Sequence, residues 1–106
     1  MSEKYQEEIK NITKQIIEKY KPEKIILYGS FAYGKPTKDS DVDLFIIKKT
    51  RKAKTLRHLE IDRILLDRKM PLDILVYTPE EVRKVSAENL FVKEILNKGK
   101  IIYASR

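Results

Sequence analysis

The chain has 106 residues, a formal net charge of +7, no cysteine and one histidine. The lack of cysteine excludes a disulfide framework and a thiolate metal site or nucleophile, and a single histidine excludes a histidine-based metal centre. This length predicts one domain over residues 1–106. The apolar runs are too short to span a membrane, and the charged first residues do not form a signal peptide, so we expect a cytoplasmic protein.

The first predicted element is an amphipathic helix over residues 3–19. Isoleucines recur there at three- and four-residue spacings between Lys, Glu and Gln, which is typical of a helix with one buried face. Ser2 is a candidate N-cap, and Pro22 prevents the helix from continuing. The apolar run 24–28 then predicts a strand, and residues 30–33 a short helical turn.

Gly29 and Ser30 lie where that strand ends and the helical turn begins. Backbone N–H groups at a helix start, together with a hydroxyl, are usual groups for binding a phosphate. By itself such a dipeptide also occurs in ordinary turns, so its meaning depends on the residues that follow.

Two carboxylates, Asp41 and Asp43, stand at the start of the next predicted strand, residues 42–47. Because strand side chains alternate with period two, both are expected on the same face of the sheet. Like charges this close are unfavourable unless a cation lies between them. Mg²⁺ is the first candidate, since it keeps some waters and accepts phosphate oxygens. A polar turn before a strand is the alternative.

A third carboxylate, Asp73, lies in the predicted strand 72–77. A helix predicted over residues 53–69 is long enough to return the chain, so the two strands should run parallel, with Asp73 beside Asp41 and Asp43. A lone charge at a strand edge is the alternative, which the cost of burying an unpaired carboxylate disfavours. The buried stripe of that helix is predicted to comprise Leu56, Leu59, Ile61, Ile64, Leu65 and Leu66.

The positive charge is densest over residues 48–57. We interpret this basic run as a solvated loop and helix start, with contact to a nucleic acid or another polyanion as the alternative. Because the strand carries Lys48 to the end opposite the carboxylates, the run is not expected to line their site. Thr78, Pro79 and Glu81 predict a capping-box helix start and a helix to Val85. A helix over 88–98 and a short edge strand over 100–104 complete the prediction.

The stretch from residue 28 to residue 47 resembles the signature of the nucleotidyltransferase superfamily that includes DNA polymerase β. It reads G-S-x-A-x-G and then S-D-x-D-L, and Asp73 stands where the family has a third carboxylate. More narrowly, it is similar to minimal nucleotidyltransferases, small prokaryotic proteins often paired with a HEPN-domain toxin. Tyr33 departs from the pattern, since relatives commonly carry Arg there. The matched positions are Gly29, Ser30, Ala32, Gly34, Ser40, Asp41, Asp43 and Leu44.

The resemblance implies an α+β nucleotidyltransferase fold, a small mixed sheet with helices packed on it. It also implies an enzyme that transfers a nucleoside monophosphate, AMP from ATP, to a hydroxyl. Asp41, Asp43 and Asp73 would hold two Mg²⁺ ions, with Asp73 also orienting the acceptor, while Gly29 and Ser30 would bind the phosphates.

The resemblance further implies a partner. The acceptor would be a tyrosine on a HEPN-domain toxin, to which this protein is the antitoxin, in an oligomer with that partner or with further copies of the chain. Two other interpretations stay open: an antitoxin that acts by occlusion with an idle nucleotide site, and a small-molecule adenylyltransferase, such as one acting on aminoglycosides.

Overall fold

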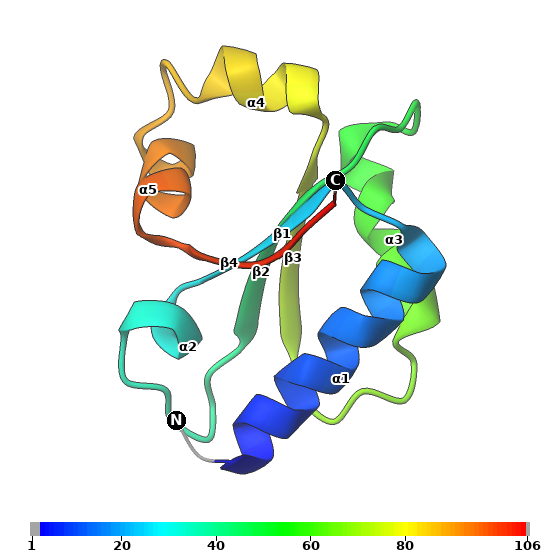
Figure 1. The fold of residues 1–106 in the computed structure, drawn as a ribbon, viewed down its shortest axis with the longest axis vertical. Coiled ribbons are helices and arrows are strands. Elements are labelled where there is room, and N and C mark those ends of the chain that lie inside the picture. The colour runs from blue at the N-terminus through cyan, green and yellow to red at the C-terminus, as the bar shows by residue number, and fades with distance from the viewer. Residues whose placement is uncertain (1–2, 106) are drawn as a thin grey trace.

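The computed structural model describes residues 3–105 as a four-stranded sheet with helices on both faces (Figure 1). Within this range there are four strands and five α-helices, so the predicted mixed α/β class is confirmed. The strands are β1 (Lys24–Tyr28), β2 (Val42–Ile47), β3 (Leu72–Tyr77) and β4 (Lys100–Ala104). The helices are α1 (Glu3–Tyr20), α2 (Ser30–Tyr33), α3 (Arg57–Ile64), α4 (Pro79–Val85) and α5 (Leu90–Lys98), with a 3-10 turn, η1 (Lys54–Leu56), before α3.

The sheet has the order β3-β2-β1-β4 and is mixed. β1 pairs antiparallel with both β2 and β4, whereas β2 and β3 run parallel. A parallel pair needs a crossover that returns the chain to the starting end of the sheet, and η1 and α3 supply it. The predicted direction of β3 is therefore confirmed, and β2 and β3 begin at the same end.

An apolar core lies on each face of the sheet. On one face α1 and α3 cover strand residues such as Leu44, while on the other α4 and α5 cover Phe45 and Tyr77. Figure 1 shows α1 and α3 on one side of the sheet and α5 on the other. Because alternate residues share a face, Asp43 and Asp73 lie on the side of α4 and α5.

The crossover helix is shorter than the predicted 53–69. The 3-10 turn η1 precedes it, and α3 itself comprises only Arg57–Ile64. Its buried positions, Arg57 and Ile61, and Leu65 directly after it are spaced by four residues, which makes a single narrow stripe facing the core. The predicted buried stripe is wider than the observed one, and its additional leucines are wrong. Three of its members point to solvent, with exposures of 53%, 47% and 81% for Leu56, Leu59 and Leu66.

The other elements follow the prediction closely. All four strands and α2 have the expected bounds, and the capping box of Thr78 and Glu81 is present. α5 begins two residues later than expected because the Asn89 side chain caps it. The expected N-cap, Ser2, lies outside the described residues. No helix within residues 3–105 combines the length and the apolar character needed to cross a membrane.

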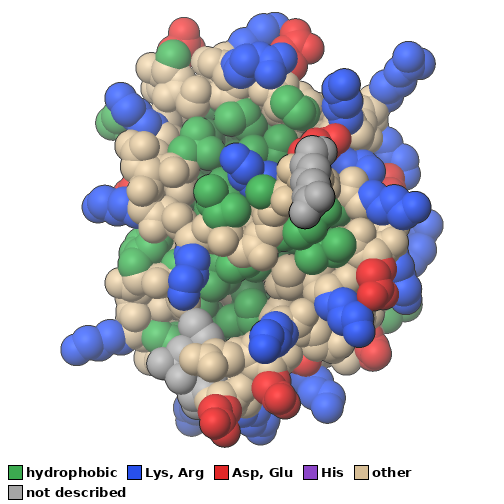
Figure 2. Space-filling view, in the orientation of Figure 1, with side chains coloured by type: hydrophobic (Ala, Val, Ile, Leu, Met, Phe, Trp, Pro, Cys, Tyr) green, Lys and Arg blue, Asp and Glu red, His purple; other side chains and the backbone are tan. Residues whose placement is uncertain are grey.

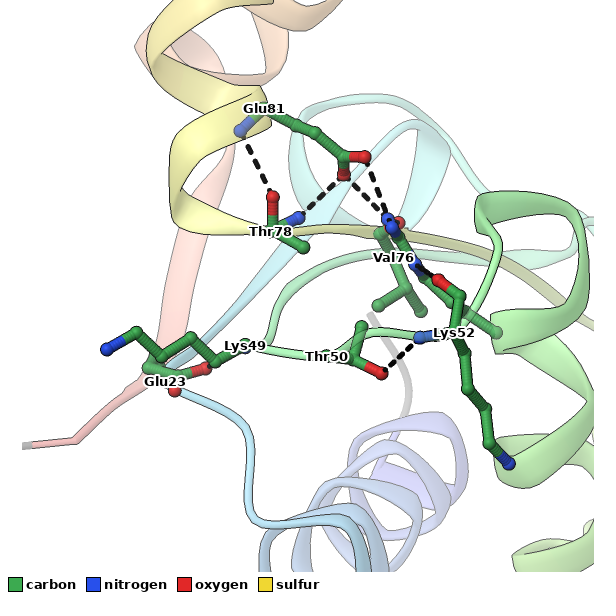
Figure 3. A network of polar contacts seen from close by, with 8 residues as sticks. Glu23, Lys49, Thr50, Lys52, Val76, Thr78 and Glu81 are labelled. Carbon is green, nitrogen blue, oxygen red and sulfur yellow. Dashed lines mark hydrogen bonds and ion pairs between the residues drawn. The ribbon is translucent and has the colours of Figure 1, made fainter.

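A partly buried ion pair joins the start of α3 to the start of α4 (Figure 3). The Arg57 side chain, only 7% exposed, donates from Nη1 to the Val76 carbonyl oxygen at 3.0 Å and from Nε to the Lys52 carbonyl oxygen at 2.9 Å. Both Glu81 carboxylate oxygens accept from the guanidinium, at 2.6 and 3.1 Å, and one of them also accepts from the Thr78 N–H. Two parallel charge-assisted bonds make this a strong and directional contact.

Other cations of the basic run have structural partners as well. Lys48 Nζ donates to the carbonyl oxygens of Tyr20 and Lys21 at the end of α1, where a positive charge is stabilising. Lys54 Nζ lies 3.8 Å from the centre of the Tyr77 ring. On the face in Figure 2, Lys and Arg side chains are spread around the molecule. The prediction of a solvated run is therefore wrong at Arg57, which is buried, and it fits the exposed Lys49, Arg51 and Lys52. A contact with a polyanion stays a prediction.

The Arg57–Glu81 pair predicts a pH-dependent contribution to stability. The hydrogen bond from Arg57 is the main reason why the pKa of Glu81 falls from 4.5 to about 2. A lowered carboxyl pKa in the folded state stabilises the fold above pH 4.5, and this contribution disappears as the pH falls from 4.5 towards 2. Glu81→Gln should lower the free energy of unfolding at pH 7 by about 1.5–3 kcal/mol, the usual range for hydrogen bonds to charged groups.

Denaturant unfolding at several pH values would measure this difference. The control is Glu80→Gln, one residue earlier in α4, whose ion pair with Lys84 is 70–75% exposed on both sides. This control should lose less than about 1 kcal/mol at pH 7. An equal loss for both variants at pH 7, or a Glu81→Gln effect that persists unchanged at pH 2, would contradict the assignment.

Candidate active site

Asp43 and Asp73 lie side by side at the end of the sheet where β2 and β3 begin. They are Cα partners in the parallel pairing of these strands, so their side chains leave the same face. The cost of burying an unpaired carboxylate, which was expected to act on Asp73, is absent. Asp73 is exposed, and β3 is the outer strand of the described sheet, so no burial cost applies to its carboxylate.

Asp41 lies one residue before the start of β2 and is exposed. It is therefore not held in the ladder as Asp43 is. Its negative charge nevertheless acts on Asp43, whose pKa it helps to raise. Asp43 is thus the carboxylate on which the charges of both other predicted acids act.

Asp43 bears the electrostatic cost of this arrangement. Burial, and then the charges of Asp73 and Asp41, raise the pKa of its carboxyl from 3.8 to about 6. Each of these causes disfavours the ionised form, and a bound cation would reverse the effect of the two neighbouring charges. A partly buried carboxylate between two others is therefore a position where a cation is energetically favourable.

Gly29 places the turn after β1 directly against Asp43. Its φ of 74° and ψ of −154° fall in a region that is almost closed to other residues. A Cβ at this position would collide with the Asp43 carboxylate. Glycine is therefore required twice, for its backbone conformation and for the close approach of the carboxylate.

Ser30 follows as the first residue of α2, with Gly29 as the N-cap. The N–H groups of Ala32 and Tyr33 donate to the Gly29 carbonyl oxygen. The first N–H groups of a helix have no partner within it, so those of Ser30 and Phe31 are the ones the turn can offer to a ligand. The structure thus brings the predicted Gly-Ser turn and Asp43 together.

Tyr28 adds a third side chain to the row of Asp43 and Asp73. It is the Cα partner of Asp43 in the antiparallel pairing of β1 and β2. Burial, and then the charges of Asp73 and Asp43, raise the pKa of its hydroxyl well above the ordinary value. The hydroxyl therefore stays protonated and can donate a hydrogen bond. The sequence did not predict the place of Tyr28 in this row, because only the strand pairing reveals it.

The acidic residues fit Mg²⁺ as a partial coordination shell. Within residues 3–105, no three side chains of Asp, Glu or His are gathered closely enough to form a complete metal site. Mg²⁺ usually takes only one or two protein carboxylates, with water and substrate phosphates completing its shell. The paired Asp43 and Asp73 meet that requirement, and the three-carboxylate site with two ions stays a prediction.

A separate groove of about 480 Å³ lies between α1 and β4. Leu27 and Ile102 line it, and both belong to the core on the α1 face of the sheet. Glu18 is the single carboxylate in its lining, alongside several lysines. The groove therefore lies on the opposite face from Asp43 and takes no part in the carboxylate site.

Replacing Gly29 with Ala should damage both the fold and the site. The new Cβ would meet the Asp43 carboxylate in a backbone region that costs about 1–3 kcal/mol, so the free energy of unfolding should fall by at least about that amount. The control is Ser30→Ala, the adjacent position, which introduces no such strain and should leave the melting temperature nearly unchanged. Thermal unfolding of the two variants checks this, and equal melting temperatures for both would contradict the proposed contact.

Replacing Asp43 with Asn should stabilise the protein at neutral pH. Because the fold raises the carboxyl pKa from 3.8 to about 6, ionisation of Asp43 lowers the free energy of unfolding increasingly as the pH rises from 3.8 to 6. The full cost applies above pH 6, and no cost applies below pH 3.8. After a discount for solvent screening, we expect a gain on the order of 1 kcal/mol at pH 8 in metal-free buffer. Asp67→Asn, an exposed aspartate in the crossover, is the control, and denaturant unfolding at pH 8 and pH 3.5 is the measurement. A loss of stability for Asp43→Asn at pH 8 would rule this out.

Comparison with known proteins identifies a family for the chain. None of the curated proteins compared with the chain matches it. The sequence model of the family described as "Polymerase beta, Nucleotidyltransferase" matches residues 7–106, which include all four strands and every predicted site residue. The resemblance to the superfamily of DNA polymerase β is thereby confirmed. Since the match spans most of its length, the chain belongs to the polymerase β nucleotidyltransferase family.

Proposed function

We propose that the protein transfers a nucleoside monophosphate from a nucleoside triphosphate to a hydroxyl group, with Mg²⁺ as the cofactor. Membership in the family establishes nucleotidyl transfer as the general reaction. One observation supports this chain's own capacity for it: Asp43 is flanked by Asp73 across the strand pair and by the Gly29 turn. Metal-binding acids and a phosphate-binding turn would then act on the same triphosphate.

In the proposed reaction the acceptor oxygen attacks the α-phosphorus, and the bond between the α-phosphorus and the bridging oxygen breaks. The β- and γ-phosphates leave as pyrophosphate, held by the Ser30 hydroxyl and the N–H groups after Gly29. Asp73, exposed on its outer strand, would orient the acceptor hydroxyl and receive its proton. Asp41 and Asp43 would hold Mg²⁺ together with Asp73. When bound, Mg²⁺ supplies charge stabilisation to the attacking and leaving oxygens.

We further propose that the donor is ATP and that the acceptor is a tyrosine of a HEPN-domain toxin, which AMP transfer would inactivate. The exposure of Asp73 supports a large acceptor, because the acceptor side of the site is open to solvent at the edge of the sheet. The protein would then act as an antitoxin by covalent modification of its partner.

The test is to incubate the protein with Mg²⁺, labelled ATP and a purified HEPN-domain partner, and to locate the label by mass spectrometry. Asp43→Asn and Asp73→Asn should each slow the transfer by at least about 10²-fold, because electrostatic stabilisation of a transition state is worth that much per group. Asp67→Asn is the matched control and should transfer at the parent rate. Chelation of divalent cations should abolish the reaction.

Two outcomes would contradict the proposal. Transfer by Asp43→Asn at the parent rate would remove this carboxylate from the chemistry. Full protection of cells from the toxin by an Asp43→Asn variant that transfers nothing would support the other interpretation, an antitoxin that acts by occlusion.

A further inference from the structure

Phe91 presents a half-exposed aromatic ring beside the row of carboxylates. Its side chain is 52% exposed, and its ring packs edge-to-face on Tyr28, with the centroids 5.8 Å apart and an interplanar angle of 83°. Tyr28 is in turn the strand partner of Asp43. One buried side chain therefore separates the exposed ring from the carboxylate at the centre of the candidate site.

The backbone holds this ring in place. Asn89 Oδ1 accepts hydrogen bonds from the N–H groups of Phe91 and Val92, which caps α5. Val92 and Ile95 are buried against the sheet, so the first turn of the helix is anchored directly after the ring. Leaving much of a phenyl ring in water forfeits part of the stabilisation that its burial would provide. The exposed ring is thus held in a fixed position although it contributes little to the core.

There is room beside the ring for a planar group. Phe91 lines a hollow of about 670 Å³ at the junction of α4 and α5. A nucleobase presents two flat π-faces and stacks on aromatic side chains whatever its sequence identity. The other lining residues are Lys84, Val85, Glu88, Asn89 and Leu90.

We propose that Phe91 is the stacking platform for the base of the bound nucleotide. This rests on the proposed function, which places the phosphates at Ser30, two residues after Tyr28, where β1 ends. In a nucleotide the ribose separates the base from the phosphates, so the base would lie at some distance from Ser30. Phe91 is an exposed aromatic ring in contact with Tyr28 at the end of β1. A phenyl ring has no hydrogen-bonding group, so Phe91 selects for a base but does not distinguish one base from another.

Tyr33 is the rival platform, since it is 50% exposed and lies near the same turn. It belongs to the same four-residue helix as Ser30, so it is placed close to the phosphates rather than beyond the ribose. Its exposure also needs no ligand to explain it, because a tyrosine hydroxyl is well solvated. These differences favour Phe91.

The experiment compares the binding of ATP with that of inorganic tripolyphosphate, which has the charge but no base, by calorimetric titration with Mg²⁺ present. Phe91→Ala should weaken ATP binding by about 5- to 100-fold, the range measured when a stacking aromatic is truncated, and should leave tripolyphosphate binding unchanged. Phe91→Leu, which keeps apolar bulk without a ring, should bind ATP as weakly as the alanine variant. Phe91→Trp, which keeps an aromatic ring, should bind ATP as tightly as the parent protein. GTP, CTP and UTP should show losses similar to that of ATP.

The controls are Leu66→Ala, an 81% exposed side chain in the crossover after α3, and Tyr33→Ala, and neither should reduce ATP binding. Equal losses for ATP and tripolyphosphate in Phe91→Ala would mean that the ring only supports Tyr28 and the turn, which would overturn the inference. Loss of ATP binding in Tyr33→Ala but not in Phe91→Ala would overturn it as well. If the parent protein binds tripolyphosphate and ATP equally well, no base contact exists. If it binds neither, the proposed function itself fails.

Discussion

The candidate site depends on the register of the parallel strands β2 and β3. Their pairing matches Asp43 with Asp73, and the alternation of side chains sends both carboxylates to the same face. A slip of one residue would move one of them to the face covered by α1 and α3. The apolar residues further along the same strands resist such a slip, because Phe45 and Leu75 pack together with α5 on one face and Leu44 with α1 on the other.

The fold tolerates an unfavourable group at this point because contacts in other parts of the structure offset its cost. Asp43 is partly buried, close to two other negative charges and in contact with the turn at Gly29. None of these features benefits the folded chain alone. Natural proteins keep such local costs at functional positions and offset them with stability from other parts of the structure. Here the Arg57–Glu81 pair lies at the opposite end of β3, and the two apolar cores extend along the whole sheet.

The sequence predicted what local patterns determine, which includes all four strands, the capping box of α4 and the parallel return of β3. It failed where the answer depends on contacts between distant residues. Arg57 and Glu81 are 24 residues apart, and no periodicity signals that one basic residue of a charged run turns inward to meet a helix cap. Similarly, the exposure of Asp73 follows from the position of β3 at the edge of the sheet, which the order of elements does not determine.

The two sides of the candidate site differ in what this chain contributes. Under the proposed reaction, Gly29, Ser30 and Phe91 would face the nucleotide, and they lie directly after β1 and in the first turn of α5, which Asn89 caps. On the acceptor side, Asp73 is exposed on an outer strand. Under the proposed reaction, the chain itself would therefore recognise the nucleotide, whereas the shape of the acceptor has to supply much of the contact on the other side. A partner that covers the β3 edge would both present its hydroxyl to Asp73 and shield that carboxylate from water, which strengthens its interaction with a bound cation.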